Sequence, residues 1–522
     1  MSHHSTNRRR LSRFPLCAAA LMLALVRPAV AAPETGAAPE PPASEDAWFV
    51  VTIRGQQCGY VHEMMRRVGD EVHSESDTQI SIRRGEATVK MRMERAYRES
   101  LDGRPLAFRA VQTLGAMPQT IEGEIQGDKI ILTTTQQPGA GFRSEYPFDS
   151  ECRFSWGQML ASKRHGLAAG VEYDVKTYDP SIKTDGPIEM HIRVHGTERV
   201  DVLGKPQTLH RLTSSMKLPS GGMTIDSDAW VDDEYTPIIT NVDAGIMKMT
   251  MYRTTKEEAL KRGAPPEMFL ETMITSNRDL PRDVKRVKYK LSVKPGARGR
   301  LPDMPDTDMQ TFERIDDRSA YVTVRRTDWD AMRTTPAKAD APPETVAGYL
   351  KASSVCDSDN RQIRRLAIRA CKSDDAPTTK ADKLRKSITK YITNKGLDVG
   401  FATATEVVET RAGDCTEHGV LLAAVARAAG LPARGVGGLV GVPGSFRRAA
   451  NGPMEYGFHM WTQVYIHGKW VDIDAAMRQS ECDPTHIAIS LIPLGEDNLM
   501  GEVWSIVPLL GQLDIEILIV ES

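Results

Sequence analysis

Apolar and polar residues alternate with a period of two along much of the first half of the chain. In the stretch VKMRMERAY, for example, Val89, Met91, Met93 and Tyr97 share one face of an extended strand. Comparable runs recur at roughly ten-residue intervals and are separated by turn-forming residues. This pattern predicts that residues 46–280 form an all-β region, either a large antiparallel sheet or an open barrel.

Two stretches of this region predict individual strand pairs. IEGEIQGDKIIL predicts two strands around a turn at Gly127–Asp128, and MHIRVHGTERVDVLGK predicts a second pair. In the second stretch, His191 and His195 lie opposite the apolar positions. We therefore expect both histidines to face solvent rather than to bind a metal ion.

The pattern becomes helical in the last third of the chain. DSDNRQIRRLAIRAC predicts a helix that begins near Asp357 or Ser358. KADKLRKSITKYITNKG predicts a second helix that ends at Gly396. Strand-like stretches resume further on, so residues 346–522 are expected to form an α+β domain.

Changes in pattern and composition divide the chain into six segments. Two Pro- and Ala-rich stretches mark linkers between the other segments. The predicted segments are a signal peptide (1–31), a disordered linker (32–45), a β-rich domain (46–280), a small β segment (281–335), a second linker (336–345) and the α+β domain (346–522).

The N-terminus has the pattern of a secretory signal peptide. NRRRLSRF supplies positive charge, PLCAAALMLALV is a short apolar core, and Ala29–Ala31 offers a small-x-small cleavage site. No later stretch reaches the roughly 18 consecutive apolar residues that a membrane-spanning helix needs. The mature protein is therefore expected to be periplasmic or secreted and to lack an integral membrane segment.

The overall composition argues against several classes of partner and site. The 522 residues include 67 basic and 69 acidic ones, and the net charge of −2 offers no reason to expect nucleic acid as a partner. Six cysteines remain after signal cleavage, too few for a disulfide scaffold in so long a chain, and no CxxC pair indicates a zinc site. They are Cys58, Cys152, Cys356, Cys371, Cys415 and Cys482. Cys356 and Cys371 would lie at opposite ends of a helix, about 20 Å apart, which is too far for a disulfide.

Cys415 lies at the start of a predicted helix in TRAGDCTEHGVLLAAVARAAG. Asp414 is a good N-cap residue, and Gly430 would end the helix. Apolar residues cover most of the helix, which predicts a buried central helix. Backbone N–H groups and the helix dipole favour a thiolate in the first turn, although a free cysteine also occurs simply as a small buried apolar residue.

The stretch HMWTQVYIHGKWVDID predicts a hairpin with its turn near His467–Gly468. In that register, Asp474 lies opposite Trp461 and diagonal to His459. The carboxylate could orient the imidazole, and the imidazole could deprotonate Cys415. This is the nucleophile, base and orienting acid of acyl-transfer enzymes.

Three stretches, GDCTEHGVLLAAVARAAGLPAR, HMWTQVYIHGKWVDIDA and DPTHI, resemble the core of the transglutaminase-like superfamily. The resemblance covers about residues 350–490. It implies a papain-like fold in which Cys415 is the nucleophile, His459 the base and Asp474 the acid. The chain departs from the family pattern at Gln463, where the family often has Glu, and this departure bears on substrate contacts.

Other residues near these motifs have simpler interpretations. His418 is an alternative base, but a neighbour one helical turn away usually points along the helix. Asp472 is an alternative acid because it shares a strand face with the favoured carboxylate. Glu417 is expected to be an N-terminal helix charge, His486 a structural residue and Arg434 an anchor for a turn.

The sequence therefore predicts an exported cysteine-dependent acyl-transfer enzyme that forms a thioester with a peptide or glutamine-type amide. An alternative is a hydrolytic peptidase or amidase that uses the same triad on protein or cell-wall peptide. Neither hypothesis requires a metal ion or an organic cofactor, and a protein or peptide is the expected partner.

A third hypothesis is a non-catalytic envelope protein whose β-rich domain is a binding or scaffold module. A fully buried Cys415, or a His459 ring turned away from it, would favour this hypothesis. An open cleft at the thiol would favour an enzyme.

Overall fold

The computed structural model describes residues 44–522 with internal gaps. The gaps are residues 85–86, 114–117, 137–141, 180–185, 218–223, 245–246, 269–271, 282, 298–299, 335–342, 396–401, 443–452, 496–508 and 510. The predicted signal peptide, residues 32–43 of the first predicted linker, residues 336–342 of the second and Gly396 lie outside the described residues.

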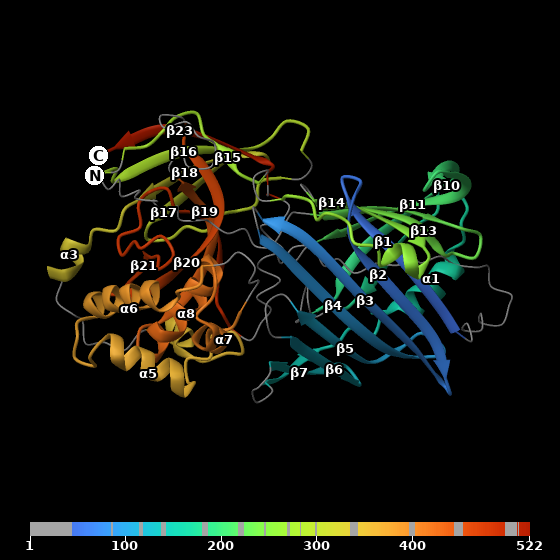
Figure 1. The fold of residues 1–522 in the computed structure, drawn as a ribbon, viewed down its shortest axis with the longest axis horizontal. Helices are drawn as coiled ribbons and strands as arrows, with labels where there is room; N and C mark the ends of the chain where they lie inside the picture. The colour runs from blue at the N-terminus through green and yellow to red at the C-terminus, as the bar shows by residue number, and fades with distance from the viewer. Residues whose placement is uncertain are drawn as a thin grey trace, which may run out of the picture.

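The described part of the N-terminal half forms one open antiparallel sheet of 14 strands, which confirms the predicted large sheet. The chain builds outward from β1 to β8, crosses to β9 and returns to β14, which pairs with β1 (Figure 1). Its strands are β1 (Ser44–Ile53), β2 (Gln56–Val68), β3 (Glu71–Arg84), β4 (Ala87–Ser100), β5 (Pro105–Thr113), β6 (Gln119–Gln126), β7 (Lys129–Gln136), β8 (Phe142–Pro147), β9 (Glu172–Thr177), β10 (Ile188–Val202), β11 (Lys205–Lys217), β12 (Thr224–Val231), β13 (Pro237–Ala244) and β14 (Met247–Thr254).

The two predicted strand pairs have different outcomes. Gly127, with φ +66°, lies in the turn between β6 and β7, as predicted. The second prediction was wrong, because MHIRVHGTERVDV belongs to the single strand β10 and the turn follows at Leu203–Gly204. Gly196, at φ +92°, forms a bulge within β10 instead of a turn. His191 and His195 face solvent.

A carboxylate from the sheet caps helix α1 (Ser155–His165), which connects β8 to β9. Phe154 is the N-cap residue and provides no side-chain hydrogen bond. Instead, Trp156 N and Gly157 N each donate to Glu99 on β4, at 2.8 Å. Glu99 is fully buried, and this burial raises its pKa to about 7.

Replacing Glu99 with alanine is expected to lower the free energy of unfolding by about 2–3 kcal/mol, because two buried N–H groups would lose their acceptor. Urea denaturation of the full chain would measure this. The matched control is Glu94→Ala, since Glu94 lies on the opposite face of β4 and is partly exposed. Equal unfolding midpoints for the two variants would contradict the capping role.

The described C-terminal region combines helices with two sheets, as the predicted α+β domain requires (Figure 1). One sheet has the order β15-β20-β19-β22, with β21 paired to β20, and the other has the order β17-β18-β16-β23. The strands are β15 (Ile274–Thr275), β16 (Arg286–Val293), β17 (Gln310–Asp316), β18 (Ser319–Arg325), β19 (Ala433–Val442), β20 (Glu455–Ile466), β21 (Lys469–Ile473), β22 (Ile487–Ile492) and β23 (Leu513–Glu521). The helices are α3 (Trp329–Thr334), α4 (Glu344–Ala347), the 3-10 helix η2 (Gly348–Leu350), α5 (Arg361–Ala370), α6 (Pro377–Tyr391), α7 (Ala404–Thr410) and α8 (Cys415–Ala428). The short helix α2 (Lys256–Ala259) follows β14 and packs on β1 of the N-terminal sheet.

Strand pairing joins segments that are far apart in the sequence. The strands of residues 281–335 share a sheet with the C-terminal strand β23, which pairs with β16. Strand β15, which follows the N-terminal sheet, pairs with β20. Helices α5, α6 and α7 surround α8, which packs on β19 and β20. The helix that carries Cys415 is therefore the centre of this domain.

Two predicted helix boundaries were wrong. Helix α5 begins at Arg361, because Asn360 caps it by accepting a hydrogen bond from Gln362 N at 2.8 Å. Helix α6 ends at Tyr391 and does not continue to Gly396, because the following N–H groups of residues 393 and 394 donate to the Arg411 carbonyl. Both ends are therefore determined by hydrogen bonds that compete with helix continuation.

The six described cysteines are free thiols, including Cys356 and Cys371. Within the described residues, no helix combines the length and the apolar character that crossing a membrane requires.

Candidate active site

The turn before α8 depends on a glycine and two carboxylates. Gly413 has φ +147°, and a Cβ atom there would lie 2.2 Å from Glu417 Cβ. The Asp414 side chain accepts a hydrogen bond from Thr416 N at 3.0 Å, and Glu417 accepts one from Asp414 N at 2.8 Å. This capping box confirms Asp414 as the N-cap and places Cys415 in the first turn of α8.

Glu417 supports the turn from a fully buried position. Its second carboxylate oxygen accepts a hydrogen bond from Ala402 N at 3.1 Å. Burial, together with the nearby Asp414 carboxylate, raises the pKa of Glu417 well above its usual range. The side chain therefore links α8 to the chain before α7 as a structural group.

The thiol of Cys415 lies against strand β20. Its sulfur accepts a hydrogen bond from Met460 N at 3.4 Å, so it is next to the strand position that follows His459. This N–H group and the N-terminus of α8 both favour negative charge on the sulfur. The residue is 1% exposed, and His459 is 2% exposed. The nucleophile candidate thus lies against the strand that carries the base candidate, and both side chains are buried.

The predicted hairpin forms in the predicted register. His467 and Gly468 make a two-residue turn, with φ values of +50° and +82°. Thr462 pairs with Ile473, so Asp474, one residue beyond β21, comes opposite Trp461 as expected. The carboxylate is thereby brought to the diagonal neighbour, His459.

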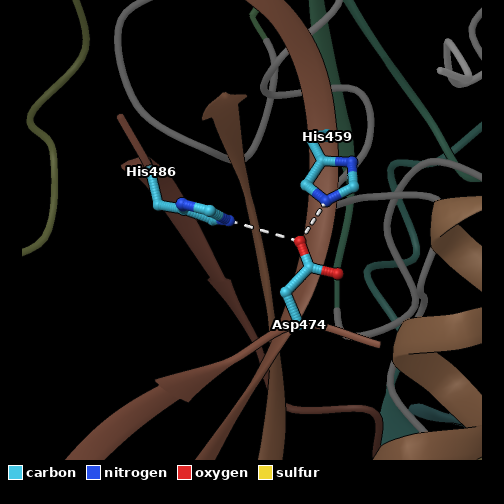
Figure 2. A group of neighbouring side chains, drawn as sticks. All are labelled: His459, Asp474 and His486. Atoms are coloured by element: carbon cyan, nitrogen blue, oxygen red, sulfur yellow. Dashed lines mark hydrogen bonds and ion pairs between the residues drawn. The ribbon is translucent and has the colours of Figure 1, made fainter. Parts of the chain in front are cut away.

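Asp474 and His459 form a buried hydrogen bond. The distance between His459 Nε2 and Asp474 Oδ2 is 2.6 Å (Figure 2). Met477 N donates to Asp474 Oδ1 at 2.8 Å, and His486 Nε2 lies 3.2 Å from Oδ2. Burial alone would raise the pKa of Asp474, but the two histidines outweigh it and hold the pKa well below its usual range. Asp474 is therefore an ionised acceptor.

The alternative base and acid have other partners. His418 Nδ1 contacts the Asp414 carbonyl oxygen of its own helix, and burial lowers its pKa to about 4. Asp472 accepts a hydrogen bond from the Trp461 indole N–H at 2.8 Å. Neither side chain takes the position that the hairpin gives to Asp474.

Gln463, the departure from the family pattern, contacts a buried arginine. Arg434 Nε donates to Gln463 Oε1 at 2.9 Å, and its guanidinium lies 4.0 Å from the centre of the Trp470 ring. Burial lowers the pKa of Arg434. Arg434 thus bridges β19, β20 and β21, which is a larger structural role than the predicted turn anchor.

His486 is the site residue whose position sequence reasoning missed. It was expected to be structural, yet its ring is within hydrogen-bond distance of Asp474. The stretch DPTHI carried a signal in its resemblance to the family, but no local pattern placed this histidine near the hairpin. Its position depends on the pairing of β22 with β19.

Among the described residues, His459, Asp474 and His486 could together supply three metal ligands. Their ligand atoms lie within 4.8 Å of one another, and all three residues are buried. The separations of 2.6 and 3.2 Å are also those of ordinary hydrogen bonds. We therefore interpret the group as a hydrogen-bonded cluster.

Comparison with known proteins identifies one family. Residues 364–475 match the model of the transglutaminase-like superfamily. The match includes all three predicted site residues, Cys415, His459 and Asp474. No curated protein sequence matches the chain.

Several solved structures resemble parts of the chain. A candidate cysteine protease from Cytophaga hutchinsonii is 16% identical with a TM-score of 0.29, over 47% of this chain and 87% of that protein. A β-barrel-like protein from Brucella abortus, whose domain has no known function, is 12% identical with a TM-score of 0.30, over 41% and 96%. The periplasmic domain of TgpA from Pseudomonas aeruginosa is 16% identical with a TM-score of 0.25, over 39% and 73%. TM-scores this low carry no argument about function.

Proposed function

We propose that this chain, whose residues 364–475 form a transglutaminase-like domain, is a cysteine-dependent acyl-transfer enzyme. Cys415 is the nucleophile, His459 the base and Asp474 the residue that orients it. One observation carries the proposal: His459 is bound to Asp474 at 2.6 Å, and the next residue of its strand donates a hydrogen bond to the Cys415 sulfur. The three groups thus come together from α8, β20 and the end of β21.

The proposed reaction proceeds through a thioester. His459 takes the proton of the Cys415 thiol, the sulfur attacks the carbonyl carbon of a peptide or glutamine-type amide, the C–S bond forms, and the C–N bond then breaks. His459 gives its proton to the departing amine. An acceptor amine or water next attacks the thioester and loses a proton to His459, and the C–S bond breaks to restore the thiolate. Because Nε2 of His459 faces Asp474, Nδ1 is the nitrogen that exchanges the proton.

The charge that develops on the carbonyl oxygen needs hydrogen-bond donors. The backbone N–H of Cys415 is one proposed donor, because it lies in the first turn of α8, where helix N–H groups lack partners within the helix. An amine acceptor would make the protein a transglutaminase, whereas water would make it a peptidase or amidase. Mass spectrometry of a glutaminyl peptide incubated with a primary amine distinguishes a new amide from a free acid.

Burial of the thiol favours a second candidate function. Cys415 is 1% exposed, and a thiol that a substrate cannot reach is expected in a non-catalytic envelope-binding protein. Against this, an ionised carboxylate buried between two histidines is costly to desolvate and contributes little to packing. Because the thiol is buried, the proposed enzyme has to expose it before a substrate can bind.

Alkylation of Cys415 by iodoacetamide, followed by mass spectrometry as a function of pH, tests the proposal. At pH 6 we expect modification that His459→Ala slows at least about tenfold, because thiolate formation then falls toward that of a free thiol with a pKa of roughly 8.5. The internal controls are four cysteines whose burial raises their pKa to about 12: Cys58, Cys152, Cys356 and Cys482. A thiol that is unreactive, or indifferent to His459, would favour the binding protein.

We also propose that the protein acts in the periplasm or outside the cell, on a protein or peptide such as cell-wall peptide. The signal-peptide pattern of residues 1–31 supports this location. Cell fractionation with mass spectrometry of the N-terminus is expected to find the chain outside the cytoplasm without these residues. An intact N-terminus in the cytoplasm would contradict it.

A further inference from the structure

Asp474 binds two imidazoles, although orienting one base needs only one. The same oxygen, Oδ2, lies 2.6 Å from His459 Nε2 and 3.2 Å from His486 Nε2 (Figure 2). The histidine side chains come from different segments and converge on the carboxylate from different directions. The side chains of all three residues are at most 1% exposed. His486 therefore contacts the orienting acid directly, in a site closed to water.

Both ring nitrogens of His486 face hydrogen-bond acceptors. Nδ1 lies 3.1 Å from the Asp483 carbonyl oxygen and 3.4 Å from Asp483 Oδ1, while Nε2 faces Asp474. A carbonyl and ionised carboxylates can only accept, so each nitrogen must carry a proton. These contacts favour the imidazolium form of His486. Burial alone would lower its pKa, but the contacts with Cys482, Asp474 and Asp483 raise the pKa well above its usual range.

The strand arrangement fixes His486 in this position. It directly precedes β22, which pairs with β19, and β19 pairs with β20 on its other side. At Gly438 of β19, a Cβ atom would lie 2.1 Å from the Ile487 carbonyl oxygen and 2.7 Å from Trp461 Cη2. A glycine there lets β22 and the indole come close. The His486 ring then packs edge-on against Trp461, with 5.2 Å between ring centres.

Other ionisable groups also act on His486. His459 is the neighbouring cation when it is protonated, with 6.2 Å between the two ring centres. Asp472 lies close enough to interact electrostatically, and Cys482 and Asp483 precede His486 in the same loop. Asp474 and Asp483 contact the ring of His486 directly.

We propose that His486 is a positioning residue of the active site, which holds the Asp474 carboxylate against His459 and offsets part of its negative charge. This inference rests on the proposed acyl-transfer function. Two consequences follow for His459. Its ring keeps the orientation that Asp474 imposes, and the positive charge of His486 offsets part of the carboxylate charge that acts on the ring. Four side chains, rather than three, therefore determine how readily the Cys415 thiolate forms.

The test measures the pH profile of Cys415 alkylation in two variants of the full chain. His486→Phe fills similar space but removes the hydrogen bond and the charge, and we expect at least a tenfold slower reaction at pH 6. His486→Gln keeps an N–H donor for Asp474, and we expect it to retain most of the rate. In this second variant, the pH profile of alkylation is expected to shift along the pH axis relative to the wild type, because a positive charge near the site is gone.

A matched control is His467→Asn, a histidine-to-amide change in the hairpin turn, where Asn tolerates the positive φ. It is expected to leave the alkylation profile unchanged. If His486→Phe reacts like the wild type, His486 only fills space and the proposal is overturned. If His486→Phe does not fold by circular dichroism, His486→Gln decides, because a pH profile of alkylation identical to that of the wild type overturns the proposal.

Failure of the proposed acyl-transfer function gives a different result from failure of the His486 proposal alone. In that case the wild-type Cys415 is unreactive at pH 6, or it reacts equally in His459→Ala. The positioning role of His486 is then overturned together with the acyl-transfer function. A reactive, His459-dependent thiol that is insensitive to both His486 variants overturns only the positioning role.

Discussion

Replacing Asp474 with asparagine is expected to reduce acyl transfer by about 10³- to 10⁴-fold, the scale seen when the acid of a Ser–His–Asp triad becomes an amide. Asp474 accepts from both imidazoles on Oδ2 and from Met477 N on Oδ1, whereas the amide has one acceptor oxygen and an NH2 donor in place of the other. His459 would then lose its fixed tautomer and orientation. The kcat/KM for a glutaminyl peptide with hydroxylamine as acceptor measures the loss.

Asp472→Asn is the matched control, because Asp472 lies two residues away and accepts a hydrogen bond from the Trp461 indole rather than from a histidine. We expect a change of less than tenfold in that variant, and equal losses in both would contradict the assignment of Asp474.

The same replacement also changes the response to acid. The folded-state pKa of Asp474 lies well below its unfolded value of about 3.9, so its stabilising contribution is complete above that value. This contribution is lost as the pH falls toward the folded-state pKa. Asp474→Asn should therefore flatten the dependence of stability on pH below about pH 4.

Replacing Arg427 with methionine is expected to have the largest effect on stability, about 4 kcal/mol or more. This arginine, near the end of α8, is 5% exposed and donates five hydrogen bonds to backbone carbonyls. The acceptors are the carbonyl oxygens of Lys351, Ala433, Pro493 and Leu494. Methionine preserves much of the volume but leaves these carbonyls without their donor, and each buried unsatisfied group costs about 1–3 kcal/mol. Urea denaturation measures the loss.

Arg365→Met provides the control, since Arg365 is an exposed arginine on α5. Its replacement is expected to change stability by no more than about 0.5 kcal/mol. If the two variants unfold at the same urea concentration, Arg427 does not hold the chain segments around α8 together.

Several features were predictable because neighbouring residues determine them. Alternating apolar residues predicted the β-rich half, since successive strand side chains point to opposite faces. Asp414 and Gly430 marked the ends of α8, and His467–Gly468 fixed the hairpin register that brings Asp474 next to His459. Each of these outcomes depends on hydrogen bonds or periodicity within about 15 residues, which can be read directly from the chain.

Other predictions failed where a distant segment competed for the backbone. The stretch around Gly196 became a bulge within β10 because β11 pairs along both sides of it. Helix α6 stopped at Tyr391 because the next N–H groups bond to Arg411. Helix α1 lies in the region predicted to be all-β, and its cap comes from Glu99, more than 50 positions earlier in the chain.

The sequence by itself thus determined the β-rich and α+β halves, the helix that carries Cys415 and the hairpin that joins His459 to Asp474. Only the tertiary structure decided that the thiol is closed to solvent and that His486 shares Asp474. The reason is physical: burial and the pairing of β22 with β19 depend on contacts between segments that no local pattern relates.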